Sequence, residues 1–172
     1  TGSAISFGLQ TQAGTYTVVA TNTTTTCTNN MTGSAVIVIN PLPTAYNVTG
    51  GGEYCAGGTG VLVGLSNSQS GISYQLLLNG NPIGSSVNGT GSAISFGLQT
   101  LAGSYTVRAT NTTTLCEAIM SGAVTITINP LPTAFNVTGG GAYCAGDPGV
   151  EVGLSGSQLN VSYQLYLNGN PI

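Results

Sequence analysis

The sequence predicts an all-β fold built from tandem β-sandwich domains with an 89-residue period, and three observations support this. The stretch that begins at Thr1 returns at Thr90, an offset of 90 − 1 = 89 residues, and the match runs without insertion to Ile83 and Ile172, with 22 of the 83 aligned pairs different. Runs rich in Val, Ile, Thr and Tyr alternate with clusters of Gly, Asn and Ser, as strands alternate with turns. No stretch has the 3.6-residue periodicity of a helix.

Two Pro-x-Pro segments mark the expected domain boundaries. Pro41 to Pro43 and Pro130 to Pro132 each stand between two β-rich runs, as short stiff linkers do. We therefore expect residues 1–40 to be the C-terminal half of one domain, 41–129 to be a complete domain, and 130–172 to be the N-terminal half of a third, completed by the next copy. The repeat is longer than the roughly 20 to 50 residues of solenoid units, so each domain can hold its own core.

Comparison of the two copies predicts both the strands and their buried faces. Six strands are expected in the complete domain: 44–50, 61–66, 72–80, 93–99, 104–111 and 123–129. Leu62 aligns with Glu151 and Leu77 aligns with Tyr166, whereas neighbours such as Val63 stay apolar in both copies. This alternation with a period of two is typical of sandwich strands, and it predicts that Leu62 and Leu77 face outward.

The segment AGSYTVRATN, residues 102–111, resembles strand F of immunoglobulin-like domains. Gly103 and Tyr105 fit the tyrosine-corner pattern, in which the Tyr hydroxyl bonds to the backbone at the sandwich edge, and Tyr16 repeats it. Val107 stands where an antibody domain has its second Cys, and the chain has no Trp. The resemblance therefore implies tandem immunoglobulin-like β-sandwich domains in the broad sense, without antibody-type recognition.

The composition argues against most kinds of chemistry. The chain has no His and no Lys; Arg108 is its only base and its acids are Glu53, Glu117, Asp147 and Glu151. Since general acids, general bases and metal ligands are almost absent, the sequence predicts no enzyme, no catalytic residue, no metal site and no cofactor. A net charge of −3 with a single cation argues against nucleic-acid binding and electrostatic membrane attachment. No run approaches the ~18 apolar residues of a membrane span.

The cysteines predict a disulfide in each domain. Cys55 and Cys116 lie 116 − 55 = 61 residues apart in the complete domain, and Cys144 would pair with Cys27 of the next copy at the same spacing. Such a bond typically contributes ~2 to 5 kcal/mol to a small secreted domain and indicates an oxidising, extracellular location. Other pairings and free buried thiols remain as alternatives.

Glycosylation is the modification that the sequence favours. Seven Asn residues begin N-x-[ST] sequons, namely Asn22, Asn30, Asn47, Asn88, Asn111, Asn136 and Asn160. Chance alone gives roughly three or four in a chain so rich in Asn, Ser and Thr. However, 3% charged residues is far below the usual ~25 to 35% of a surface, so covalent glycans would supply solvation. The alternative is that Thr and Asn solvate the β surface unaided.

Four segments that span nearly the whole repeat carry a wider resemblance: NPLPTAYNVTGGGEYCAGGTGVLVGLS, SYQLLLNG, GTGSAISFGLQTLAGSYTV and ATNTTTLC. They are similar to the Ig-like tandem repeats of very large secreted surface proteins of Bacteroidota-type bacteria. That resemblance implies an extracellular adhesin or fibre-like array of near-identical domains, and it brings no catalytic residues.

Together these features predict a structural component of an extracellular filament, fibre or stalk whose partners are copies of itself. Since the repeat begins and ends inside a domain, we expect a segment of a longer continuous array. The alternative is head-to-tail polymerisation, in which residues 130–172 of one subunit complete a sandwich with residues 1–40 of the next. The second choice of function is a surface adhesin module that binds glycans, because loops at sandwich ends often carry recognition. Ice binding by Thr-rich strands is a third, weaker alternative.

Overall fold

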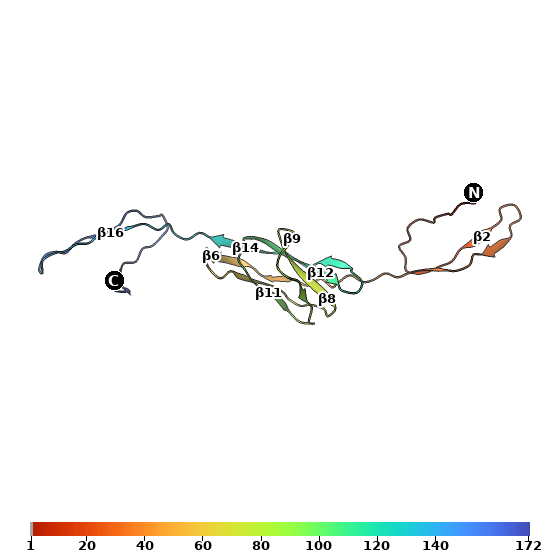
Figure 1. Cartoon of the computed structure of the whole chain (residues 1–172), viewed down its shortest axis with the longest axis horizontal. Helices are drawn as coiled ribbons and strands as arrows, with labels where there is room; N and C mark the ends of the chain where they lie inside the picture. Colours follow the sequence, from red (N-terminus) through yellow and green to blue (C-terminus); the bar gives the residue numbers. More distant parts are fainter. Residues whose placement is uncertain (1) are drawn as a thin grey trace.

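The computed structural model describes residues 2–172, which contain strands and turns and no helix, so the predicted all-β class is confirmed for this range. No helix that could cross a membrane is present among these residues. The central part of the chain holds ten strands, which include all those of four residues or more (Figure 1). They are β5 (Val48–Gly50), β6 (Gly52–Cys55), β7 (Val61–Leu65), β8 (Ile72–Leu78), β9 (Asn81–Pro82), β10 (Val87–Asn88), β11 (Ile94–Gln99), β12 (Gly103–Asn111), β13 (Glu117–Ile119) and β14 (Val124–Asn129).

The central strands form two sheets. One has the order β10-β8-β12-β14-β6, with β13 paired to β12 and β9 paired to β8, and the other has the order β11-β7-β5. Neighbouring strands are antiparallel except β6 and β14, which run parallel. β6 and β14 are the first and last strands of the larger sheet in chain order, and they lie side by side and run in the same direction.

One apolar core lies between the two sheets, an arrangement consistent with a β-sandwich. Burial alternates along β8 and β12, as it does in strands with one face in a core. The core residues come from both sheets: Val63, Leu65, Ile72, Tyr74, Leu76, Ile94, Tyr105, Val107, Ala109, Met120 and Ile126.

The six predicted strands are all present, and the prediction of buried faces holds at Leu62 but not at Leu77. Leu62 is 51% exposed, as expected, whereas Leu77 is only 6% exposed. The prediction for Leu77 was wrong because the chain folds back after β8, and β9 places Pro82 directly opposite Leu77. The short strands β6, β9, β10 and β13 were not expected.

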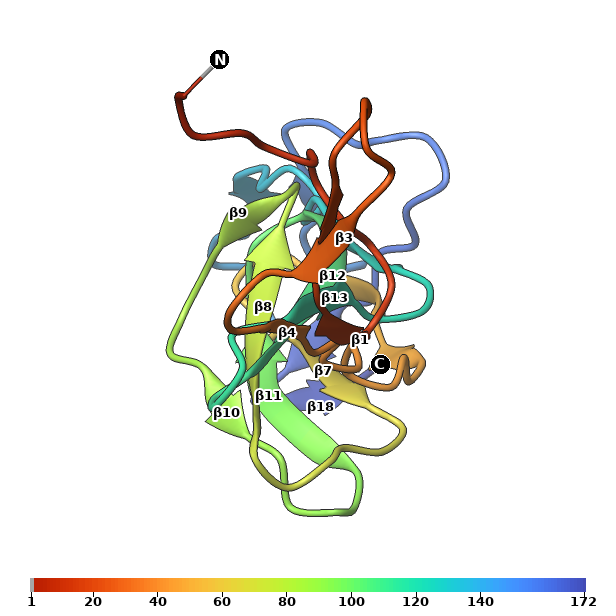
Figure 2. The ribbon, with the colours of Figure 1, turned by 90° about the vertical axis from the view of Figure 1, so that its right-hand side faces the viewer.

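The two ends of the chain form only two-stranded ribbons, at opposite ends of the elongated molecule (Figure 1). Viewed along the long axis, the N-terminal ribbons lie in front of the central sheets (Figure 2). The N-terminal strands are β1 (Gly14–Tyr16), β2 (Val19–Thr21), β3 (Thr28–Asn30) and β4 (Ala35–Ile37). The C-terminal strands are β15 (Val137–Gly139), β16 (Val152–Leu154), β17 (Tyr166–Leu167) and β18 (Asn170–Pro171).

These ribbons repeat pairings of the central sandwich. Tyr16 of β1 lies opposite Ala35 of β4, just as Tyr105 lies opposite Val124 at positions 89 residues later. The same correspondence of registers holds between β2–β3 and β12–β13, between β15–β16 and β5–β7, and between β17–β18 and β8–β9. Each end of the chain therefore carries part of the hydrogen-bond pattern found in the centre.

Candidate functional site: two open sheet faces

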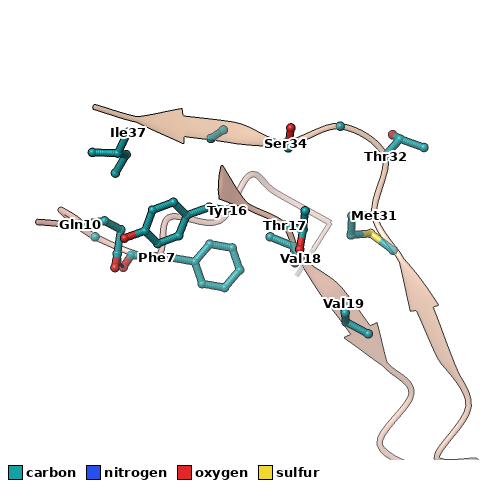
Figure 3. Close-up of a pocket in the computed structure, with 13 residues that line it drawn as sticks. Phe7, Gln10, Tyr16, Thr17, Val18, Val19, Met31, Thr32, Ser34 and Ile37 are labelled. Carbon is teal, nitrogen blue, oxygen red and sulfur yellow. Dashed lines mark hydrogen bonds between the residues drawn. The ribbon is translucent and has the colours of Figure 1, made fainter. Parts of the chain in front are cut away.

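The N-terminal part of the chain exposes an apolar hollow, which we call the N face. The hollow has a volume of about 950 Å³, and the side chains that line it include Phe7, Tyr16, Val18, Met31 and Ile37. Figure 3 shows Phe7, Tyr16 and Ile37 toward one end of the hollow and Val18 and Met31 toward the other. The N face contains no charged side chain among its lining residues, so it suits an apolar β-segment better than a charged ligand.

Four apolar residues of the N face are identical to residues that the central sandwich buries: Tyr16, Val18, Met31 and Ile37 correspond to Tyr105, Val107, Met120 and Ile126. Ile5 is 72% exposed, whereas Ile94, its counterpart 89 positions later, is 9% exposed; for Met31 and Met120 the values are 42% and 3%. Residues 5–10 form no strand, whereas their counterparts form β11, which pairs with β7. The N-terminal part contains no counterpart of β7, which explains both differences.

The C-terminal part has a matching hollow, the C face, of about 570 Å³. Its lining includes Val137, Val152, Leu154, Tyr163 and Leu165. Tyr163 is 44% exposed, although its counterpart Tyr74 is fully buried in the centre. Here the missing elements are counterparts of β11, β12 and β14. The match between these residues and buried central positions is the sequence signal that could have located both faces.

The two faces complement each other. The N-terminal part has the counterparts of β12 and β14 and lacks that of β8, while the C-terminal part has part of β8 and lacks β12 and β14. In the centre, β8 and β12 pair over seven residues, from Tyr105 opposite Leu78 to Asn111 opposite Ile72. The open edge of each face, with unpaired backbone groups beside apolar side chains, can bind a further strand.

The predicted tyrosine hydrogen bonds are present. The Tyr105 hydroxyl donates to the carbonyl oxygen of Leu101 at 2.6 Å, and the Tyr16 hydroxyl donates to that of Gln12 at 2.9 Å. Burial raises the pKa of the Tyr105 hydroxyl above its ordinary value, and the bond to Leu101 opposes this shift. The corner thus forms even in the N-terminal part, because it needs only residues close in sequence.

The structure does not bring Cys55 and Cys116 together, and no disulfide is formed among the described residues. Cys55 lies opposite Asn129 at the end of β6, next to the end of β12 that begins at Gly103. Cys116 follows the other end of that nine-residue strand, so at about 3.3 Å per residue the length of β12 alone separates the two cysteines by more than about 26 Å. A disulfide requires Cα atoms within about 7 Å. By the same geometry, Cys144 and Cys27 of a next copy would lie at opposite ends of one sandwich.

The predicted glycosylation sites lie on the surface. Asn22, Asn30, Asn47, Asn88, Asn136 and Asn160 are exposed, and Asn111 is partly buried. The side-chain Oδ1 of Asn111 accepts hydrogen bonds from the amides of Thr113 and Thr114 at 2.9 and 3.0 Å, and Asn22 holds the matching turn in the N-terminal part. These bonds leave the Nδ2 atom, the atom to which an N-linked glycan would be attached, without a role in the turn.

Charged groups are few and do not cluster. In residues 2–172 no group of three His, Cys, Asp or Glu side chains could hold a metal ion. Arg108 and Glu117 form one surface ion pair at 3.7 Å, with side chains 39% and 49% exposed. An exposed pair of this kind contributes little to stability.

Comparisons with protein-family models, with curated proteins and with solved structures find no match.

Proposed function

We propose that the chain is a structural unit of an extracellular fibre or stalk, in which the N face of one copy and the C face of a second copy join into an immunoglobulin-like sandwich. The observation that carries this proposal is the complementarity of the two faces. Each exposes residues whose counterparts are buried in the central sandwich, and each lacks the strands that the other has.

The central sandwich supplies the register of the joint. Transfer of the β8–β12 pairing places Tyr16 opposite Leu167, Val18 opposite Leu165, and Ala20 opposite Tyr163 of the second copy. These contacts bury apolar side chains that are exposed in the isolated chain, which favours association. The joint closes both hollows at once, because the strands that line the C face fill the hollow of the N face, and the strands that line the N face fill the hollow of the C face.

The composition supports a passive, exported role. Only 3% of the residues are charged, and six of the seven sequon Asn side chains are exposed, so glycans are the proposed source of solvation. The second copy can be a later repeat of the same long chain or a separate subunit, and the contacts of the joint are the same in both cases. Intact mass of the native material under reducing, denaturing conditions separates these sources: subunits give a mass near 17.1 kDa plus any glycan, and a continuous array gives a much larger one.

The joint is tested by light scattering and electron microscopy of the purified chain, kept reduced so that only noncovalent contacts count. We expect head-to-tail oligomers whose length rises with concentration. Leu165→Glu places a charge in the joint, and it should leave monomers. Leu62→Glu is the matched control, since Leu62 lies outside the core and its counterpart is Glu151.

Two results would contradict the proposal. The chain could remain monomeric at every concentration, or Leu165→Glu could assemble as well as Leu62→Glu. Circular dichroism of each variant checks that the central sandwich, whose apolar core neither substitution enters, remains folded.

A further inference from the structure

Cys116 lies at the junction between the N-terminal part and the central sandwich. Its Sγ is 3.9 Å from the carbonyl oxygen of Asn40, the residue directly before the linker Pro41 to Pro43. Cys116 is partly buried there, in the loop that follows β12. The thiol therefore faces the end of the neighbouring unit rather than the core of its own.

Cys55 lies at the other junction. It is opposite Asn129 in the parallel pairing of β6 with β14, and the next amide, that of Ala56, donates to the carbonyl oxygen of Asn129 at 2.8 Å. Asn129 is the counterpart of Asn40 in the repeat. The carbonyl oxygen at this position of the repeat therefore contacts Cys116 at the first junction, where it belongs to Asn40. At the second junction, where it belongs to Asn129, it contacts Ala56, the neighbour of Cys55.

We propose that a disulfide joins Cys116 of one copy to Cys144 of the second copy that completes its N-terminal sandwich. The equivalent bond joins Cys27 of the first copy to Cys55 of the second. This inference rests on the proposed function, because it requires the two faces to join in the central register. In that register Cys144 of the second copy, the counterpart of Cys55, lies opposite Asn40 of the first copy. The Sγ of Cys116 of the first copy is already next to that Asn40.

The pairing links neighbouring sandwiches, so each joint between two copies carries two covalent bonds. Every cysteine of the chain then has a partner, and none needs to cross the length of its own sandwich. Cys27, Cys55 and Cys144 are exposed in the isolated chain, so their thiols are open to a partner from another copy.

Each bond forms by thiol–disulfide exchange with an oxidised disulfide compound, which is glutathione disulfide in the test below. One cysteine thiolate attacks glutathione disulfide and releases the first reduced glutathione. The second cysteine thiolate then attacks the mixed disulfide and releases the second. Two cysteine thiols and one glutathione disulfide thus give one protein disulfide and two reduced glutathione molecules, and the two electrons pass to glutathione.

The test compares the full chain kept reduced with the full chain oxidised by glutathione disulfide. We expect the oxidised chain to give a ladder of multiples of 17.1 kDa on a denaturing, non-reducing gel and to collapse to one band on reduction. Mass spectrometry of peptic fragments should identify Cys116–Cys144 and Cys27–Cys55 links. The double variant Cys27→Ser, Cys116→Ser should lose the ladder and still assemble under native conditions.

Three outcomes would overturn the inference. One is a Cys55–Cys116 link within a monomer band. Another is a ladder that persists in Leu165→Glu, which would show that the thiols pair by random collision. The third is thiols that remain open to alkylation after oxidation: if the reduced chain nevertheless assembles, the disulfide inference fails alone, and if it stays monomeric, the proposed function fails with it.

Discussion

The hydroxyl of Tyr105 donates a hydrogen bond of 2.6 Å to the carbonyl oxygen of Leu101, and Tyr105 itself is fully buried. The bond fixes the loop between β11 and β12 to the strand that crosses the middle of the larger sheet. The carbonyl of Leu101 loses this partner if the hydroxyl is removed.

Tyr105→Phe should lower the free energy of unfolding by about 1 to 2 kcal/mol, because a buried hydrogen bond is lost while the ring still fills its space. Urea titration followed by circular dichroism measures the change. Tyr46→Phe is the control, since Phe135 stands at the matching position of the second copy, and it should leave the midpoint unchanged. Equal effects of the two substitutions would show that the corner bond does not contribute.

The sandwich should lose stability at alkaline pH. Burial raises the pKa of Tyr74 and of Tyr105 above the ordinary value of 10.0. Above about pH 10 the unfolded chain therefore releases these phenol protons while the folded chain keeps them, so the stabilisation is complete below that pH and is lost as pH rises through the folded values. Urea midpoints measured between about pH 8 and pH 11 should fall only in the upper part of this range, and a midpoint that is constant throughout would contradict the assignment.

Gly50→Ala should destabilise the chain by more than about 3 kcal/mol, because two costs add. Gly50 has a φ of +92°, and a Cβ atom there would collide with the carbonyl oxygen of Leu62 on β7. Gly80→Ala is the control: Gly80 has a φ of +84° with open space around it, so the change costs only the backbone strain of about 1 kcal/mol. Thermal unfolding of both variants separates the collision from the strain.

Asn111→Ala should destabilise the turn after β12 by about 1 kcal/mol, because two amides lose their acceptor. Asn111→Asp keeps the oxygen that accepts from Thr113 and Thr114, so it should unfold like the unchanged chain. Both variants remove the sequon. In glycosylated material, both should lose the same glycan mass while differing in urea midpoint; no mass change in either would show that Asn111 carries no glycan.

The central strands could be predicted because alternation is visible over five residues or more, as it is from Ile72 to Leu78. The strands β6, β9, β10 and β13 are two to four residues long, too short to show any period. The burial of Leu77 was predicted wrongly because a difference between the two copies shows only that the position tolerates another side chain. The hairpin of β8 and β9 covers this variable position from the side away from the core.

The positions of Cys55 and Cys116 at opposite ends of the sandwich could not be predicted, because a spacing of 61 residues along the chain carries no information about which end each residue occupies. That is decided by the direction of β6, which is parallel to β14 and carries Cys55 toward the C-terminal linker, and by the direction of β12, which carries the chain to Cys116 at the N-terminal linker.

The parallel pairing of β6 with β14 has a mechanical consequence. The chain enters the sandwich from the linker at one end, passes through β5 to β6, and leaves β14 through the linker at the other end, so tension applied to the two ends of the chain pulls β6 and β14 in opposite directions. The backbone bonds from Gly52 opposite Ile126 to Cys55 opposite Asn129 lie across the direction of pull and are loaded together in shear, instead of opening one at a time as in a peeled hairpin. The load also passes through β5, which lies between the N-terminal linker and β6 and pairs with β7, so extension strains both sets of bonds.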